Sequence, residues 1–131
     1  MAGRFTCGAV AASLQCRAMW DSYIALGDSF TEGLDDPRES GKFRGWADRL
    51  AAALHERNPS LQYSNLAVRG RTTEAIEREQ VPVAVSQSPQ LVSIASGVND
   101  LLRASWDPAR TFAAMDRSLA ALRAAGADVL V

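Results

Sequence analysis

Short apolar runs alternate with longer amphipathic segments along this chain. Such runs are typical of strands in a parallel sheet, because helices cover both faces of that sheet and few polar positions interrupt each run. Four strands are predicted in this way, at residues 23–26, 61–68, 91–96 and 128–131. Their alternation with helices predicts an α/β fold, a doubly wound parallel sheet covered on both faces.

In the segments between these strands, apolar residues recur at helical spacing. Three helices are predicted: one that begins near Trp46 and stops at Asn58, one that begins at Thr72, and one that runs from Asp107 to Gly126. Thr72 and Asp107 carry the hydroxyl and carboxylate groups that cap helix N-termini, and proline follows Asp107 at the first helical position.

A residue suited to catalysis follows each of the first three strands by a few positions. Ser29 lies in a Gly-Asp-Ser motif, Gly70 lies between two arginines, and Asn99 lies in a Gly-Val-Asn-Asp motif. In open parallel sheets, ligands bind beyond the carboxyl ends of the strands. The three residues are therefore expected to converge on one rim of the sheet.

These three residue types together are suited to acyl transfer. Ser29 would attack an acyl carbonyl, and the charge that develops on the carbonyl oxygen needs fixed hydrogen-bond donors. The backbone N–H groups of Ser29 and Gly70 and the side-chain amide of Asn99 could supply them. Asp28 and Asp100 are predicted to hold the loops by hydrogen bonds rather than to act as acids or bases.

Each of the three residues also has a purely structural interpretation. Ser29 could cap the segment that follows it, and Gly70 could serve a simple turn. Asn99 could form an Asx-turn or cap a short helix. Taken singly, these interpretations of Gly70 and Asn99 are at least as good as the catalytic one, and it is the combination that favours chemistry.

The three motifs, in this order, are similar to those of the SGNH (GDSL-type) hydrolase family. The resemblance covers residues 22–131 and includes the stretches at 44–47 and 66–71. It implies a flavodoxin-like three-layer sandwich and a serine hydrolase that cleaves small carboxylic esters through an acyl-enzyme. It also implies Ser29 as nucleophile, an oxyanion hole formed by Ser29, Gly70 and Asn99, and no metal or organic cofactor.

The fourth block of that family, an Asp-x-x-His near the C-terminus, is absent from this sequence. The single histidine, His55, is predicted near the end of the first long helix, roughly 15 Å from the serine rim. We therefore assign it no catalytic role and expect this chain to be poorly active or inactive. Because the sequence ends within a strand, we interpret the domain as C-terminally truncated.

Length and composition describe one globular domain. The chain has 131 residues, 47% hydrophobic and 22% charged, with a net charge of -1. Residues 1–18, which include Cys7 and Cys16, are interpreted as a weakly structured extension, and residues 19–131 as the domain. We expect a cytoplasmic protein, with secretion less favoured, and neither a membrane span nor nucleic-acid binding.

Two functions other than catalysis fit the same pattern. A non-catalytic module could retain a pocket for a small ligand at the rim without a base. A flavodoxin-like nucleotide-binding domain shows the same alternation of strands and helices, but no loop after a strand carries a Gly-x-Gly-x-x-Gly or P-loop motif. The acyl and alcohol groups of the substrate and the oligomeric state stay open.

Overall fold

The computed structural model of the protein describes residues 20–34 and 44–131. The extension predicted at residues 1–18 lies outside the described residues. In chain order the elements are β1 (Ser22–Gly27), α2 (Ser29–Glu32), α3 (Trp46–Arg57), β2 (Gln62–Asn65), α4 (Thr73–Glu79), α5 (Val81–Ser86), β3 (Leu91–Ala95), α6 (Val98–Leu101), α7 (Pro108–Ala124) and β4 (Asp128–Leu130).

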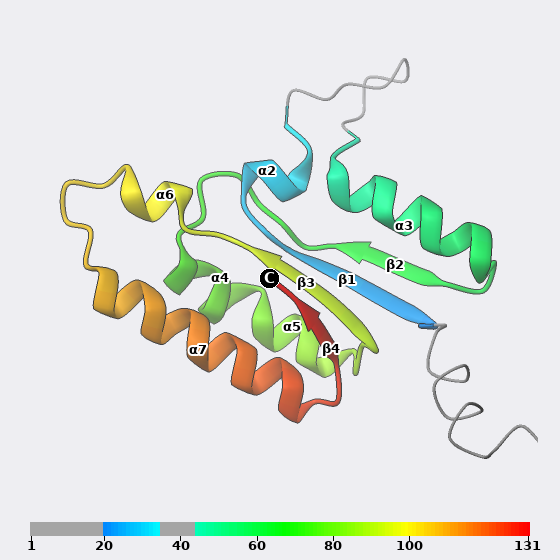
Figure 1. Ribbon diagram of the computed structural model, residues 1–131. Helices are drawn as coiled ribbons and strands as arrows, with labels where there is room; N and C mark the ends of the chain where they lie inside the picture. Colours follow the sequence, from blue (N-terminus) through cyan, green and yellow to red (C-terminus); the bar gives the residue numbers. More distant parts are fainter. Residues whose placement is uncertain (1–19, 35–43) are drawn as a thin grey trace, which may run out of the picture.

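The four strands form one parallel sheet in the order β2-β1-β3-β4. Helix α3 covers one face, and α4, α5 and α7 cover the other (Figure 1). The predicted doubly wound α/β fold is thus confirmed. β2 lies on one side of β1, and β3 and β4 lie on the other. The boundary between β1 and β3 is therefore the point where the connections change side, and ligands bind at such a switch point in open α/β sheets.

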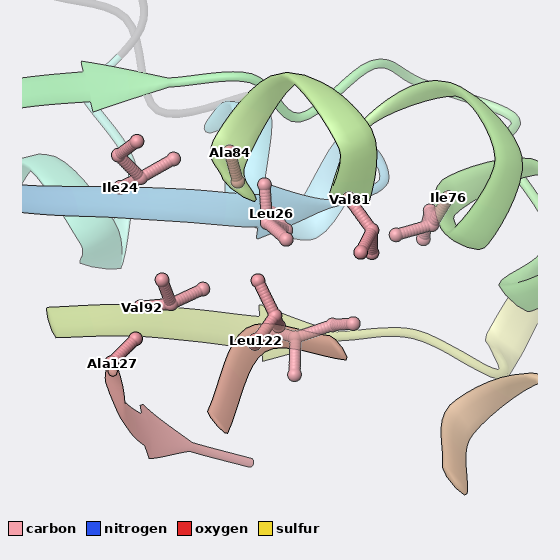
Figure 2. Packing of buried hydrophobic residues seen from close by; sticks show 9 residues of the cluster. Ile24, Leu26, Ile76, Val81, Ala84, Val92, Leu122 and Ala127 are labelled. Atoms are coloured by element: carbon pink, nitrogen blue, oxygen red, sulfur yellow. The ribbon is translucent and has the colours of Figure 1, made fainter. Parts of the chain in front are cut away.

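Alternate side chains of β1 enter two separate apolar layers. Ile24 and Leu26 pack with residues of α4, α5 and α7, and Figure 2 shows them near Val92 of β3. Tyr23 and Ala25 point to the other face, toward α3. Full burial of an aliphatic side chain of this size contributes about 1.5–3 kcal/mol. These layers fix the strands whose ends carry the candidate site.

The second strand is shorter than predicted. The sequence pattern predicts residues 61–68, whereas the structure has Gln62–Asn65. The backbone N–H groups of Leu66 and Val68 nevertheless donate to carbonyl groups of β1, at 2.9 and 3.2 Å. The chain after β2 therefore stays beside β1 up to the loop that contains Gly70.

Short helices α2, α5 and α6 were not predicted, because four to six residues are too few to establish a helical period. The helices predicted from Thr72 and Asp107 have the expected caps. Thr72 accepts a hydrogen bond from the N–H of Ala75, and Asp107 accepts one from the N–H of Ala109. No helix among residues 20–34 and 44–131 is long and apolar enough to cross a membrane.

Candidate active site

Ser29 lies directly beyond the carboxyl end of β1 and is the first residue of α2. The preceding residue, Asp28, caps this helix, since its Oδ1 accepts from the N–H of Phe30 at 3.1 Å. Capping by Asp28 leaves the partly exposed Ser29 side chain available at the rim. The capping role that the sequence left open for Ser29 thus belongs to Asp28.

The end of β1 is fixed by a buried glutamine. The side-chain amide of Gln80 accepts from the N–H of Gly27 and donates to its carbonyl, both at 2.9 Å. A Cβ atom at Gly27 would lie 2.5 Å from Thr31 Oγ1 and 2.7 Å from the carbonyl oxygen of Ala95. Only glycine fits between these atoms, and the backbone that leads into Ser29 has little freedom.

Gly70 lies in an exposed turn after β2, with a left-handed φ of +76°. This conformation favours glycine, and the simple-turn interpretation is compatible with it. The residue before it is held by α2, since a carboxylate oxygen of Glu32 accepts from the N–H of Arg69 at 3.0 Å. The loop of Gly70 is therefore attached to the helix that begins with Ser29.

Asn99 lies in α6 and connects the other two loops. Its Nδ2 donates to Oδ2 of Asp28 at 3.1 Å and to the carbonyl oxygen of Arg71 at 3.0 Å. The residues next to Ser29 and Gly70 thus share one amide group. Asn99 is not a helix cap, because Gly97 occupies the N-cap position of α6. Both amide hydrogens are engaged, since an asparagine side chain has two.

Asp100 holds α6 in place. Its side chain is buried, and its Oδ2 accepts from the N–H and Oγ1 of Thr73 at 2.9 and 3.0 Å. Thr111 Oγ1 donates to Oδ1 at 3.3 Å. One carboxylate therefore connects the loop after β3 with the starts of α4 and α7. With all these donors, Asp100 orients the loop that carries Asn99.

Two backbone donors at the rim are unused. In the described part of the chain, the N–H groups of Ser29 and Gly70 donate to no acceptor, whereas the neighbouring N–H groups of Phe30 and Arg69 do. N–H groups without an acceptor can stabilise an oxyanion where a hydroxyl attacks close to them.

His55 lies at the other end of the sheet. It is exposed in the last turn of α3. Asn58, which follows that helix, donates to the carbonyl oxygen of Trp20 at 3.0 Å and to Oδ1 of Asp21 at 2.9 Å. Trp20 and Asp21 immediately precede β1, so the end of α3 lies near the start of β1, and Ser29 follows its end.

A polar cleft of about 140 Å³ lies beside the rim, between α4, α6 and the start of α7. Thr72 and Asp100 are part of its lining, together with Arg103, Trp106 and Arg110. Ser29 does not line this cleft. Among residues 20–34 and 44–131, no group of three or more His, Cys, Asp or Glu side chains could hold a metal ion.

The sequence pattern did not identify Gln80 and Glu32. Gln80 ends α4 and was indistinguishable from a surface residue, because only the fold brings it beneath β1. Glu32 lies three residues after Ser29, yet its partner Arg69 is 37 residues away along the chain. Guanidinium hydrogen bonds from Arg69 lower the pKa of Glu32.

The model of the GDSL-like Lipase/Acylhydrolase family matches residues 25–131. The crystal structure of TesA superposes with a TM-score of 0.70 at 27% identity, covering 82% of this chain and 57% of TesA. The esterase AlinE4, of the SGNH-hydrolase family, has a TM-score of 0.67 at 23% identity, covering 82% of this chain and 56% of AlinE4.

A third structure is the psychrotrophic esterase EstA from Pseudoalteromonas sp., inhibited by monoethylphosphonate. It superposes with a TM-score of 0.66 at 21% identity, covering 83% of this chain and 57% of EstA. No curated protein sequence matches the chain. The chain thus spans just over half the length of these three structures. Because the family match extends over most of its residues, the chain belongs to the GDSL-like lipase/acylhydrolase family.

Proposed function

We propose that the protein is a serine hydrolase that cleaves carboxylic esters through an acyl-enzyme at Ser29. The observation that carries the proposal is the pair of hydrogen bonds from Asn99 Nδ2 to Asp28 and to the carbonyl of Arg71, which joins the loops of Ser29, Gly70 and Asn99. Family membership supports the reaction type. The substrate is a small ester.

The reaction begins with attack of Ser29 Oγ on the acyl carbon. An Oγ–C bond forms, and the carbonyl oxygen becomes an oxyanion that accepts hydrogen bonds from the N–H groups of Ser29 and Gly70 and from the amide of Asn99. The C–O bond to the alcohol then breaks, and the serine proton leaves with the alcohol. Water attacks the acyl-enzyme, releases the acid and restores the hydroxyl.

Asn99 must exchange one hydrogen bond to take part in this reaction. Its two amide hydrogens have acceptors in Asp28 and the carbonyl of Arg71. A hydrogen bond to an ionised acceptor is roughly twice as strong as one between neutral groups. The oxyanion therefore displaces the Arg71 carbonyl, while the carboxylate of Asp28 keeps the other hydrogen and the orientation of the amide.

Turnover by this chain is expected to be low. A serine hydroxyl needs a base to remove its proton, and the single histidine lies at the opposite end of the sheet. Removal of one member of a catalytic triad still leaves the contribution of substrate binding and of the oxyanion hole. We therefore expect slow acylation rather than none.

The position of His55 also favours a second candidate function. A module that binds a small ligand at the rim without converting it needs the oxyanion donors but no base. Such a module would bind the ligand equally well after Ser29→Ala, and Ser29 would not react with serine-directed reagents.

Labelling with an activated phosphonate, ethyl p-nitrophenyl ethylphosphonate, tests the proposal. Ser29 Oγ forms a bond to phosphorus, p-nitrophenolate leaves, and the hydroxyl proton passes to water. We expect one adduct per chain by intact mass, located at Ser29 by peptide mapping. Ser29→Ala should abolish the adduct, whereas Ser60→Ala, which changes an exposed serine beyond α3, should not.

Equal labelling of the Ser29→Ala variant would contradict the assignment of the nucleophile. Absence of labelling in the unmodified protein, together with saturable binding of ethylphosphonate, would favour the binding module. Calorimetry with ethylphosphonate on the unmodified protein and on Ser29→Ala measures that binding directly.

A further inference from the structure

The carboxylate of Glu32 makes several hydrogen bonds to one residue of a distant loop. Glu32 is the last residue of α2, the helix that begins with Ser29. One of its oxygens accepts from the backbone N–H of Arg69 at 3.0 Å. The guanidinium of Arg69 donates from Nη2 at 2.9 Å and from Nε at 3.2 Å. Backbone and side chain of Arg69 are thus both bound to α2.

A second contact joins the same two segments further from the rim. Asn65 Nδ2 donates to the carbonyl oxygen of Thr31 at 2.9 Å, and Asn65 Oδ1 accepts from the N–H of Ala67 at 3.1 Å. Asn65 therefore fixes the end of β2 against α2. Beyond Ala67 the chain continues to Gly70. Glu32 holds the residue before Gly70 through its N–H, and Asn99 holds the residue after it through its carbonyl.

Gly70 has no side chain that could fix its own orientation. A Cβ atom built there would find no atom within 4 Å, and its φ is +76°. Glycine moves readily between conformations of positive and negative φ. The direction of its N–H group therefore depends on how the residue before it is held, and Glu32 holds that residue through the backbone.

We propose that Glu32 is a positioning residue that sets the N–H of Gly70 relative to Ser29. The inference rests on the function proposed above, because it concerns the same oxyanion site. Glu32 acts through Arg69 and touches no substrate. Its loss lets the Gly70 loop move away from α2 while the sheet and the Ser29 side chain stay in place.

A second ion pair on the surface provides a matched control. Glu77 accepts from Arg117 Nε at 2.6 Å and Nη2 at 2.9 Å, between α4 and α7. The side chains of Glu32 and Glu77 are 26% and 24% exposed, and those of their arginine partners 56% and 59%. The two pairs are alike in chemistry and exposure, but only Glu32 also binds a backbone N–H beside the rim.

Phosphonate labelling of Glu32→Ala, Glu32→Gln and Glu77→Gln tests the proposal, with the maximal rate and the half-saturating concentration measured separately. Small misplacements at a reacting centre cost up to about a hundredfold in rate. We expect Glu32→Ala to lower the maximal rate about tenfold or more, with the half-saturating concentration unchanged. Glu32→Gln should lose less, because an amide oxygen can still accept the Arg69 N–H. Glu77→Gln should react like the unmodified protein.

Amide NMR provides a readout that does not depend on reactivity. In Glu32→Ala we expect faster hydrogen exchange at Arg69 and a shifted amide resonance at Gly70. Neither should change in Glu77→Gln, although both substitutions remove an exposed ion pair and should lower the thermal midpoint by similar small amounts.

The outcomes separate the two proposals. Unchanged labelling of Glu32→Ala, alongside no labelling of Ser29→Ala, would overturn the role of Glu32 and leave the hydrolase function standing. If the protein does not label at Ser29 at all, the hydrolase function fails. The NMR measurements on Glu32→Ala then test the role of Glu32. Unchanged hydrogen exchange at Arg69 together with an unchanged amide resonance of Gly70 would overturn it.

Discussion

Two asparagines at opposite ends of the sheet make the same two kinds of hydrogen bond, one to a backbone carbonyl and one to an aspartate. Asn58 Nδ2 donates to the carbonyl of Trp20 at 3.0 Å and to the carboxylate of Asp21 at 2.9 Å. Asn99 Nδ2 donates to the carbonyl of Arg71 at 3.0 Å and to the carboxylate of Asp28 at 3.1 Å.

The surroundings of the two amides differ. Near Asn58, backbone N–H groups are used: Ser60 donates to Asn58 Oδ1 at 3.0 Å, and Leu61 donates to the Asn58 carbonyl at 3.0 Å. Near Asn99, the described residues leave the N–H groups of Ser29 and Gly70 without an acceptor.

The same polar chemistry therefore serves two purposes. At the start of β1 the hydrogen bonds join α3 to the sheet, and the N–H groups of Ser60 and Leu61 have acceptors. At the end of β1 they hold three loops together, and the N–H groups of Ser29 and Gly70 have no acceptor among residues 20–34 and 44–131. Gly70 is exposed and Ser29 is partly exposed, so water, a ligand or a transition state can supply the acceptor.

The largest effect is expected from the glycine that leads into Ser29. A Cβ at Gly27 would lie 2.7 Å from the Ala95 carbonyl, so Gly27→Ala should lower the free energy of unfolding by about 3 kcal/mol. Gly126, at the other end of the sheet, has a φ of +89° and open space for a Cβ. Gly126→Ala should cost about 1 kcal/mol for the left-handed backbone alone. Urea unfolding measures both, and equal losses would contradict the close packing around Gly27.

The two asparagines should affect different properties. Asn99→Ala removes a proposed oxyanion donor and should slow phosphonate labelling of Ser29 about a hundredfold. Asn58→Ala should lower the free energy of unfolding by about 1–2 kcal/mol and leave labelling unchanged. If Asn58→Ala slows labelling as much as Asn99→Ala, the rim has no special role in the reaction.

Two glutamines, one at each end of β1, extend the comparison from asparagine to glutamine side chains. Gln80 is buried and pairs with both backbone groups of Gly27. Because the Gly27 carbonyl also accepts from Val68, Gln80→Ala chiefly removes the acceptor of the buried Gly27 N–H and should cost about 2 kcal/mol. Gln90 makes a similar pair of contacts to Asp21 at the other end, at 2.9 and 3.4 Å, but it is exposed. Water replaces those contacts in Gln90→Ala, and the loss should be below about 0.5 kcal/mol. Equal losses in urea unfolding would contradict the importance of burial at Gln80.

The smallest effect is a dependence on pH. Hydrogen bonds from Arg69 and Arg117 lower the pKa of Glu32 and Glu77 respectively. A carboxylate with a lowered pKa in the folded state stabilises the protein above its unfolded pKa, and this contribution is lost as the pH falls through the folded pKa. Exposed pairs of this kind contribute at most about 1 kcal/mol each. Unfolding free energies at pH 7 and at about pH 3 should therefore differ less in Glu32→Gln and Glu77→Gln than in the unmodified protein.

If both variants keep the full difference in unfolding free energy between the two pH values, that difference arises from other carboxylates. Of the two variants, only Glu32→Gln should also slow labelling at pH 7, which separates the pair at the rim from the pair between α4 and α7.

Much of the fold could be predicted from the sequence. The strands at residues 91–96 and 128–131 and the helix caps at Thr72 and Asp107 appear in the structure almost as predicted, because burial patterns and capping are local properties. Helix α6 and the true extent of β2 were missed, since neighbouring elements decide where such short segments begin and end.

The sequence alone determined the parallel α/β architecture and the position of each of the three motifs just after a strand. The alternation of strands and helices predicts that Ser29, Gly70 and Asn99, each a few residues after a strand, lie at the carboxyl edge of one parallel sheet. Only the tertiary structure decided which groups hold them there. Gln80 and Glu32 find their partners 53 and 37 residues away, and hydrogen bonds across such separations depend on distances that a linear pattern does not contain.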